Sequence, residues 1–279
     1  MPAADIEAPG RVRLIEAGAG PPVVLIHGAL TTLDDWRLGP LEVLAARFRT
    51  IALDRPGHGG SPRPRFEAAP ERQAGRLREA LGELGVERPV VVGHSFGGLV
   101  ALAWAAAWAE EIAGLVLLSP MAFREFRPAE HLVLGPRSYP FFGPALSEAA
   151  NATVDPPMLP RMQDLMFSPQ AVPDRWRREF PHDLALAGMV ADAEDSAVLL
   201  PGSPFSLIDH AAVTCPTRVL YGSADRVVDP NRHAVPLAAR LPHASTRRLE
   251  GLGHMLHHFA PDAVVEAVDD VLASGRPRL

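Results

Sequence analysis

The serine at the centre of residues 93–97, which read Gly-His-Ser-Phe-Gly, constrains the fold of this 279-residue chain more than any other feature. The apolar run Val-Val-Val at residues 90–92 ends just before this pentapeptide, and an alanine-rich helical pattern begins just after it. A strand that turns sharply into a helix holds the central residue, Ser95, in a strained conformation and presents its hydroxyl above a sheet. Only small residues fit on both sides of so tight a turn, and glycines stand there. We therefore predict that Ser95 is a nucleophile rather than an ordinary helix cap.

Short apolar runs alternate with helical patterns along much of the chain, which is typical of a parallel sheet covered by helices. Strands are predicted at residues 23–26, 50–53, 89–92, 115–118, 218–221 and 246–249. Helices are predicted at residues 34–48, 73–84, 232–241 and 261–272, with a further one that follows the pentapeptide and ends near residue 111.

The stretch from residue 121 to residue 211 interrupts this alternation. It contains no clear strand, and twelve of the 29 prolines fall in it, so we expect several short helices broken by proline. The predicted organisation is one α/β core, made of residues 1–120 and 212–279, with residues 121–211 inserted as a helical segment.

A serine hydroxyl needs a base that accepts its proton, and eleven histidines compete for this role. His254 follows a glycine-containing loop after the last predicted strand, and such a loop can carry the imidazole to the sheet edge where Ser95 lies. His257 and His258 lie just beyond, near the start of the closing helix, and are the competing candidates. We predict His254 as the base.

The acid that orients this histidine is predicted after the strand at residues 218–221, where residues 222–225 read Gly-Ser-Ala-Asp. Asp225 would hold the imidazole and stabilise the imidazolium that it becomes. Asp229 is the second choice. The other position for such an acid follows the preceding strand, but residues 119–121 read Ser-Pro-Met and offer no carboxylate.

Backbone N–H groups beside Ser95 would stabilise the negative charge that acyl transfer places on a carbonyl oxygen. The N–H of Phe96, directly after the serine, is one predicted donor. The second donor is expected from the loop after the strand at residues 23–26, where we place it on Ala29, with Leu30 as the alternative. His27 is expected to brace this loop rather than to touch substrate.

Taken in order, these segments resemble the α/β-hydrolase superfamily. The matching segments are residues 27–30 (His-Gly-Ala-Leu), 54–61 (Asp-Arg-Pro-Gly-His-Gly-Gly-Ser), 93–98, 222–225 and 253–254. The order of Ser95, Asp225 and His254 along the chain is also that of this fold. The resemblance implies an α/β-hydrolase fold, which is a mostly parallel twisted sheet flanked by helices, with residues 121–211 as an α-helical cap over the site.

The superfamily contains several kinds of enzyme. Its epoxide hydrolases and haloalkane dehalogenases use an Asp nucleophile, and its proline iminopeptidases usually carry Gly-Gly-Ser-Trp-Gly at the turn, so residues 93–97 disfavour all three. We predict a carboxylesterase-like serine hydrolase that cleaves a small or medium apolar ester, lactone or thioester through an acyl-enzyme. Two alternatives stay open. One is carbon–carbon bond hydrolysis of a dienoic keto acid, with Arg124, Arg127 or Arg161 on the substrate acid; the other is a weakly catalytic ligand receptor.

Composition limits the classes of partner that the chain could bind and the cellular compartment in which we expect it. A net charge of −6 without a basic run argues against nucleic-acid binding, and no stretch approaches the roughly 20 apolar residues of a membrane span. The single cysteine, Cys215, excludes an intrachain disulfide, and residues 1–13 do not resemble a signal peptide, so we expect a cytoplasmic protein. No His, Cys or acidic cluster has metal-ligand spacing, so no metal or other cofactor is predicted. The sequence makes no prediction of oligomeric state.

Overall fold

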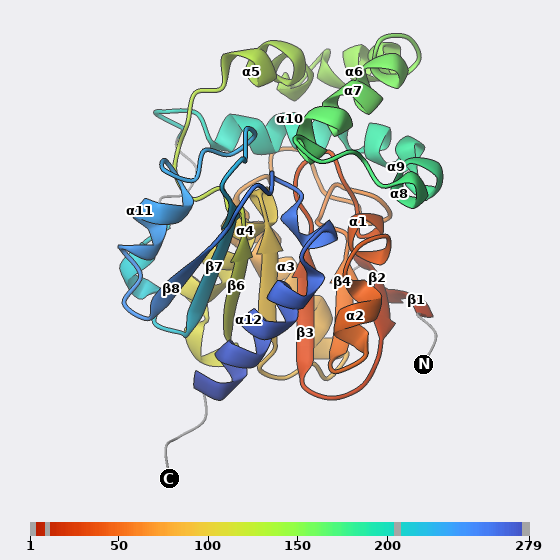
Figure 1. The fold of residues 1–279 in the computed structure, drawn as a ribbon. Coiled ribbons are helices and arrows are strands. Elements are labelled where there is room, and N and C mark those ends of the chain that lie inside the picture. The colour runs from red at the N-terminus through yellow and green to blue at the C-terminus, as the bar shows by residue number, and fades with distance from the viewer. Residues whose placement is uncertain (1–3, 9–11, 204–207, 275–279) are drawn as a thin grey trace.

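The computed structural model describes residues 4–8, 12–203 and 208–274, which form an eight-stranded sheet in the order β1-β2-β4-β3-β5-β6-β7-β8 (Figure 1). The parallel strands are β3 (Pro22–Ile26), β4 (Arg49–Leu53), β5 (Val90–His94), β6 (Gly114–Leu118), β7 (Thr217–Gly222) and β8 (Ala244–Leu249). All six were predicted. The α/β-hydrolase fold with a mostly parallel sheet is confirmed.

Two antiparallel strands, β1 (Ala4–Ala8) and β2 (Val12–Ala17), extend the sheet beyond β4 and were not predicted. The segment lacks the continuous apolar run of a parallel strand that is buried on both faces, and antiparallel strands need no such run. Residues 1–3 and 9–11, which belong to the opening segment considered for a signal peptide, lie outside the described residues.

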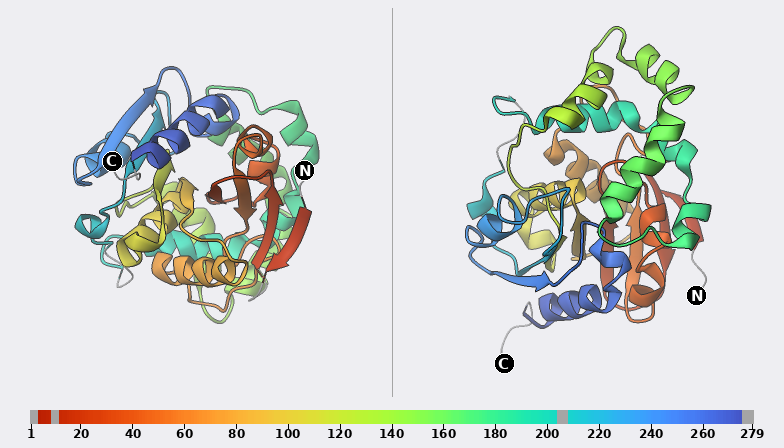
Figure 2. Two further views of the ribbon diagram at one scale, coloured as in Figure 1. Left: turned by 90° about the horizontal axis from the view of Figure 1, so that it is seen from below. Right: turned by 45° about the horizontal axis from the view of Figure 1, so that its top comes forward.

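Helices cover both faces of the sheet (Figure 2). One face packs against α3 (Pro70–Glu83), α4 (Phe96–Ala107) and α11 (Ala234–Ala238), and the other against α1 (Asp34–Arg37), α2 (Leu41–Ala45) and α12 (Pro261–Ser274). In β5, Val91 enters the first core while Val90 and Val92 enter the second, as the two-residue period of a strand requires. The helix predicted over residues 34–48 is two helices, because Gly39 and Pro40 interrupt it.

A group of helices lies between β6 and β7 in the chain and sits over the carboxyl edge of the parallel strands (Figures 1 and 2). The helices are α5 (Pro128–Leu134), α6 (Gly143–Asn151), α7 (Asp155–Phe167), α8 (Asp174–Glu179), α9 (His182–Ala187) and α10 (Met189–Val198). Residues 204–207 of the predicted insertion lie outside the described residues. The limits of the insertion at residues 121 and 211 stay predictions.

None of the helices in the described part of the chain is both long and apolar enough to cross a membrane. The cytoplasmic location remains a prediction.

Candidate active site

Ser95 stands in the tight turn between β5 and α4, with φ 53° and ψ −119°. A positive φ is strained for a residue other than glycine, and the surrounding backbone maintains it. The Ser95 N–H donates to Leu118 O at 3.0 Å, and a Cβ on Gly93 or on Gly97 would lie 2.5 Å or 2.3 Å from a backbone oxygen. The pentapeptide therefore forms the strained turn that was expected, and both glycines are required by close contact.

Asp225 and His254 form a buried pair beside this turn. His254 Nδ1 lies 2.9 Å from Asp225 Oδ2, and Asp225 Oδ1 accepts the N–H groups of Val227 and Val228 at 2.8 and 3.0 Å. Burial alone would raise the pKa of Asp225, but the charge and hydrogen bond of His254 and the two N–H donors lower it below its ordinary value. Asp229 is exposed and accepts the N–H of Asn231 at 2.9 Å, so the structure pairs His254 with Asp225 and not with Asp229.

The competing histidines contact a different carboxylate. His257 Nε2 and His258 Nε2 lie 3.0 and 2.7 Å from the two oxygens of Asp35, and Trp176 Nε1 donates to Asp35 Oδ1 at 3.0 Å. Burial lowers the pKa of His257 to about 4. Ligand atoms of Asp35 and the two histidines lie within 4.8 Å of one another, close enough for an ion, but three N–H donors already satisfy the carboxylate.

His94, the second residue of the pentapeptide, connects the nucleophile turn to the His254 loop. Its Nε2 lies 3.1 Å from the carbonyl oxygen of His254, and the two ring centroids are 4.7 Å apart. Burial, and then the neighbouring His257 and His254, hold the pKa of His94 well below its usual range, so the neutral ring donates its Nε2–H to that carbonyl. No sequence pattern indicates this role for His94.

Within the described residues, no hydrogen bond joins the Ser95 hydroxyl to the His254 ring. Ser95 is 5% exposed and His254 is 2% exposed, so both lie beneath other parts of the chain. Catalytic hydrogen bonds are often long in ligand-free structures and shorten when substrate binds. The structure thus brings Asp225 and His254 into contact and leaves the Ser95 contact unmade.

The loop after β3 lies directly against Ser95. A Cβ on Gly28 would be 3.1 Å from Ser95 Cβ, so a side chain at this position would crowd the serine. Over the described residues, the N–H groups of Ala29 and Phe96 donate to no protein acceptor. Their assignment to an oxyanion hole stays a prediction.

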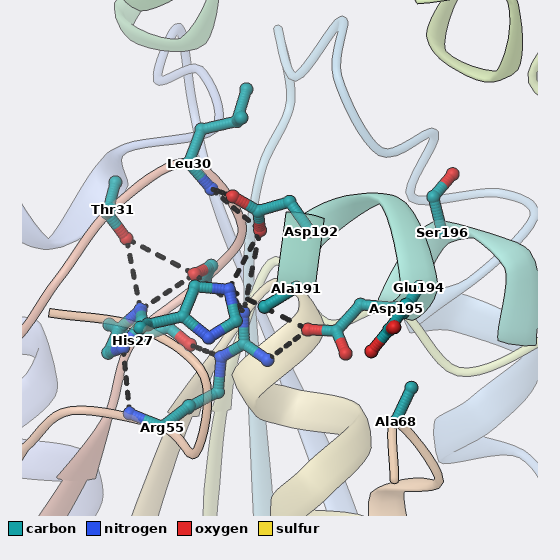
Figure 3. Close-up of polar contacts among 12 residues, drawn as sticks. His27, Leu30, Thr31, Arg55, Ala68, Ala191, Asp192, Glu194, Asp195 and Ser196 are labelled. Carbon is teal, nitrogen blue, oxygen red and sulfur yellow. Dashed lines mark hydrogen bonds and ion pairs between the residues drawn. The ribbon is translucent and has the colours of Figure 1, made fainter. Parts of the chain in front are cut away.

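The Leu30 N–H, the alternative donor, is already engaged. It lies 3.2 Å from each carboxylate oxygen of Asp192, a residue of α10 (Figure 3). His27 braces the loop in the manner expected, because its Nε2 accepts the N–H of Arg55 at 2.9 Å and its Nδ1 lies 2.8 Å from Gly28 O. Burial, and then Arg55 and His58, keep the pKa of His27 well below its usual range.

An apolar cluster formed largely by the helices between β6 and β7 packs against the loop after β3. It includes Leu30 from the loop and Met255 beside His254, with Ala29 packed against it. Its remaining buried members are Leu38, Leu134, Leu159, Met166, Phe167, Val172, Trp176, Phe180, Ala185, Met189 and Ala193. Apolar side chains therefore pack beside Ala29, one of the two candidate oxyanion donors.

Three arginines were considered for binding the acid group of a substrate. Arg127 donates to Val227 O at 2.7 Å and pairs with Glu130 at 3.0 Å, and Arg161 is exposed. Arg124 is half-buried where the inserted segment begins.

Comparison with known proteins adds a family. A model described as the alpha/beta hydrolase family matches residues 23–267. An uncharacterized protein of Mycobacterium tuberculosis is 28% identical over 274 residues, which cover 94% of this chain and 78% of that protein. Haloalkane dehalogenase 2 of the same organism is 27% identical over 271 residues, or 93% of this chain and 90% of that one. The solved structure of a thermophilic esterase from Thermogutta terrifontis superposes with a TM-score of 0.72 at 23% identity, covering 99% of this chain and 100% of the esterase.

Proposed function

The chain belongs to the alpha/beta hydrolase family, and we propose that it is a serine hydrolase that cleaves a small or medium apolar carboxylic ester, lactone or thioester. The proposed triad is Ser95, His254 and Asp225. The buried His254–Asp225 pair, 2.9 Å apart beside a serine in a strained strand-to-helix turn, carries the proposal.

The proposed reaction has two halves. Ser95 Oγ attacks the substrate carbonyl carbon while His254 Nε2 takes the hydroxyl proton, and the tetrahedral oxyanion is stabilised by the N–H groups of Ala29 and Phe96. The carbon–heteroatom bond then breaks, and His254 gives the proton to the leaving group. Water attacks the acyl-enzyme with His254 again acting as base, which releases the acid and restores Ser95. Asp225 stays ionised throughout and stabilises the imidazolium.

We further propose that the inserted helices act as a cap that defines the acyl site. Support comes from the apolar cluster that packs on Ala29, Leu30 and Met255, since apolar surface beside the reacting carbonyl favours an uncharged acyl chain. Because Ser95 is only 5% exposed, substrate reaches it after these helices shift. The missing Ser95–His254 hydrogen bond is then expected to form in the substrate complex.

The alternative reactions have less support. A haloalkane dehalogenase is among the relatives, but the superfamily's dehalogenases use an Asp nucleophile where this chain has Ser95. Hydrolysis of a dienoic keto acid requires a cationic group for the substrate acid, whereas Arg161 is exposed and Arg127 is bound to Val227 O and Glu130.

The test is a panel of esters, lactones and thioesters of graded acyl length, assayed together with a dienoic keto acid and with fluorophosphonate labelling followed by peptide mass analysis. We expect turnover of apolar esters and a label on Ser95, with Ser95→Ala losing both and kcat falling by at least about 10³-fold. Ser119→Ala is the matched control, because Ser119 is also buried at a positive φ and its hydroxyl has no partner in the described chain. Absence of both turnover and labelling in the wild type, or full activity of Ser95→Ala, overturns the proposal.

A further inference from the structure

A carboxylate from the inserted helices holds the loop that carries the candidate oxyanion donor. Both oxygens of Asp192, on α10, lie 3.2 Å from the N–H of Leu30, although 162 residues separate the two in the chain. Leu30 has a φ of 58°, an unfavourable conformation for a leucine. Figure 3 shows Asp192 pointing from its helix toward Leu30. This contact gives a physical reason for the strained loop to stay in place.

Arg55 binds two carbonyl groups of the same loop. Its guanidinium donates to His27 O at 3.1 Å and to Gly28 O at 3.3 Å, and it also lies 4.8 Å from the centre of the Phe96 ring. Arg55 thereby holds the carbonyls just before Ala29, while Asp192 holds the N–H just after it. The peptide that presents the Ala29 N–H is fixed from both directions.

Asp192 and Arg55 each have a further buried partner. His58 Nε2 lies 3.0 Å from Asp192 Oδ1, and Arg55 Nη1 lies 2.6 Å from Asp195 Oδ2, one turn further along the helix. Arg55, Asp192 and Asp195 are each no more than 1% exposed in their side chains. Helix α10 therefore carries Asp192 itself and, through Asp195, binds Arg55.

Guanidinium groups pair with the carboxylates of this group, which makes burial of the carboxylates tolerable. Three carboxylates meet three guanidinium groups: Asp192, Glu194 and Asp195 with Arg55, Arg63 and Arg65. Ligand atoms of His58, Asp192 and Asp195 lie within 4.8 Å of one another, a spacing that an ion could use. The Arg55 guanidinium stands 2.6 Å from Asp195 and 3.1 Å from His58 Nε2, so a cation is already present there.

We propose that Asp192 is a positioning residue for the oxyanion hole. By binding the Leu30 N–H it aims the neighbouring Ala29 N–H at the carbonyl oxygen of a substrate on Ser95, so the hole is complete only when α10 is seated. The inference rests on the proposed function, because it assigns Asp192 a part in stabilising the oxyanion of that reaction.

The test compares Asp192→Ala and Asp192→Asn with Glu194→Gln. Glu194 is the matched control, since it is a buried carboxylate on the same helix that pairs with Arg63 and Arg65 and does not touch the loop. We expect Asp192→Ala to lower kcat by about 10- to 100-fold with KM changed less than about threefold, because an oxyanion donor acts mainly in the transition state. Asp192→Asn keeps one acceptor oxygen and should lose less, and Glu194→Gln should stay within about twofold.

A second readout separates positioning from general damage. A trifluoromethyl ketone matched to the best substrate forms a tetrahedral oxyanion on the serine, whereas the corresponding amide binds without forming one. Asp192→Ala should weaken binding of the ketone by the same factor as kcat/KM and leave binding of the amide unchanged. Hydrogen exchange of the Leu30 amide should also accelerate in this variant and not in Glu194→Gln.

Each outcome decides between the claims. An active wild type with Asp192→Ala no slower than Glu194→Gln overturns this inference alone, as does equal weakening of the ketone and the amide. A wild type with neither turnover nor fluorophosphonate labelling overturns the proposed function and this role together. Where Asp192→Ala fails to fold, Asp192→Asn provides the same comparisons, with loss of ketone affinity as the supporting result.

Discussion

His254 Nδ1 lies 2.9 Å from Oδ2 of Asp225, whose other oxygen accepts two backbone N–H groups from the following turn. The turn thus fixes the carboxylate, and the carboxylate fixes the imidazole. Because Asp225 has a pKa below its ordinary value, it is ionised at neutral pH and accepts the Nδ1–H of His254 when that ring is in its base form. The Nε2 atom is then left with a lone pair, as a base for Ser95 requires.

Asp225→Asn is expected to lower kcat by about 10³- to 10⁴-fold with little change in stability, because an amide can hold the wrong tautomer of His254. Asp229→Asn is the control, since Asp229 is exposed and bonds only within its own turn. Steady-state rates on the best ester of the panel measure both. A large loss in Asp229→Asn with a small one in Asp225→Asn would reverse the assignment of the acid.

His94→Phe is expected to lower kcat by up to about tenfold, because it removes one hydrogen bond, worth roughly 1 kcal/mol, from the carbonyl of His254. His94→Gln can restore a donor and should recover part of the rate. Measuring both kcat and the free energy of unfolding in urea separates a loss of rate from a loss of stability. Equal rates for the two variants would show that the donor does not matter.

Parallel strands such as β5 and β6 could be predicted because they are buried on both faces and therefore read as short, continuous apolar runs, whereas β8 is polar and largely exposed. Ser95, Asp225 and His254 could be proposed because each follows a parallel strand directly or by a short loop, so local sequence sets their place at the carboxyl edge of the sheet. β1 and β2 escaped prediction because antiparallel strands need no continuous apolar run and so carry a weaker pattern.

The contacts that could not be predicted join residues far apart in the chain. Asp35 binds His257 and His258 across 222 and 223 positions, and Asp192 binds Leu30 across 162. No periodicity marks such partners, because only the packing of the inserted helices and α12 against the core brings them together. Polar residues that appear to belong to surface loops can therefore be buried and paired.

Trp176→Phe is expected to lower the free energy of unfolding by about 2 kcal/mol more than Trp104→Phe does. Both indoles are buried, but Trp176 Nε1 donates to Asp35 at 3.0 Å, whereas Trp104 Nε1 has no partner within the described structure. Losing a hydrogen bond to a charged group costs about 1.5–3 kcal/mol, while the loss of ring volume is common to both variants. Equal destabilisation in urea would show that the indole–carboxylate bond contributes nothing.

The buried histidines predict that the folded state loses stability as the pH falls below about 6.5. His257 is fully buried, and this burial lowers its folded pKa to about 4, whereas an unfolded histidine titrates near 6.5. Between these two values the unfolded chain binds a proton that the folded chain does not, so acid favours unfolding by about 1.4 kcal/mol per pH unit for this one group. The contribution of His257 to the free energy of unfolding is complete above about pH 6.5. Roughly 3 kcal/mol of it has been lost when the pH reaches 4. Asp35 does not oppose this trend. Burial raises its pKa, but the two histidines lower it more, so the pKa lies well below the ordinary value. The contribution of Asp35 to stability is therefore lost only below about pH 4.

Urea unfolding of the wild type at pH 7.5, 6.5, 5.5 and 4.5 measures this loss, and His257→Gln assigns it. Glutamine can still donate an N–H to Asp35 but does not titrate, so the pH slope of this variant should be shallower by about one proton. His243→Gln makes the same change at an exposed histidine and should follow the wild type. His27 and His94, whose pKa values burial also lowers, should leave part of the slope in His257→Gln, so a slope that disappears entirely would mean that those two rings do not contribute. A wild-type stability that is flat from pH 7.5 to 4.5 would contradict burial of neutral histidines as the cause of acid sensitivity.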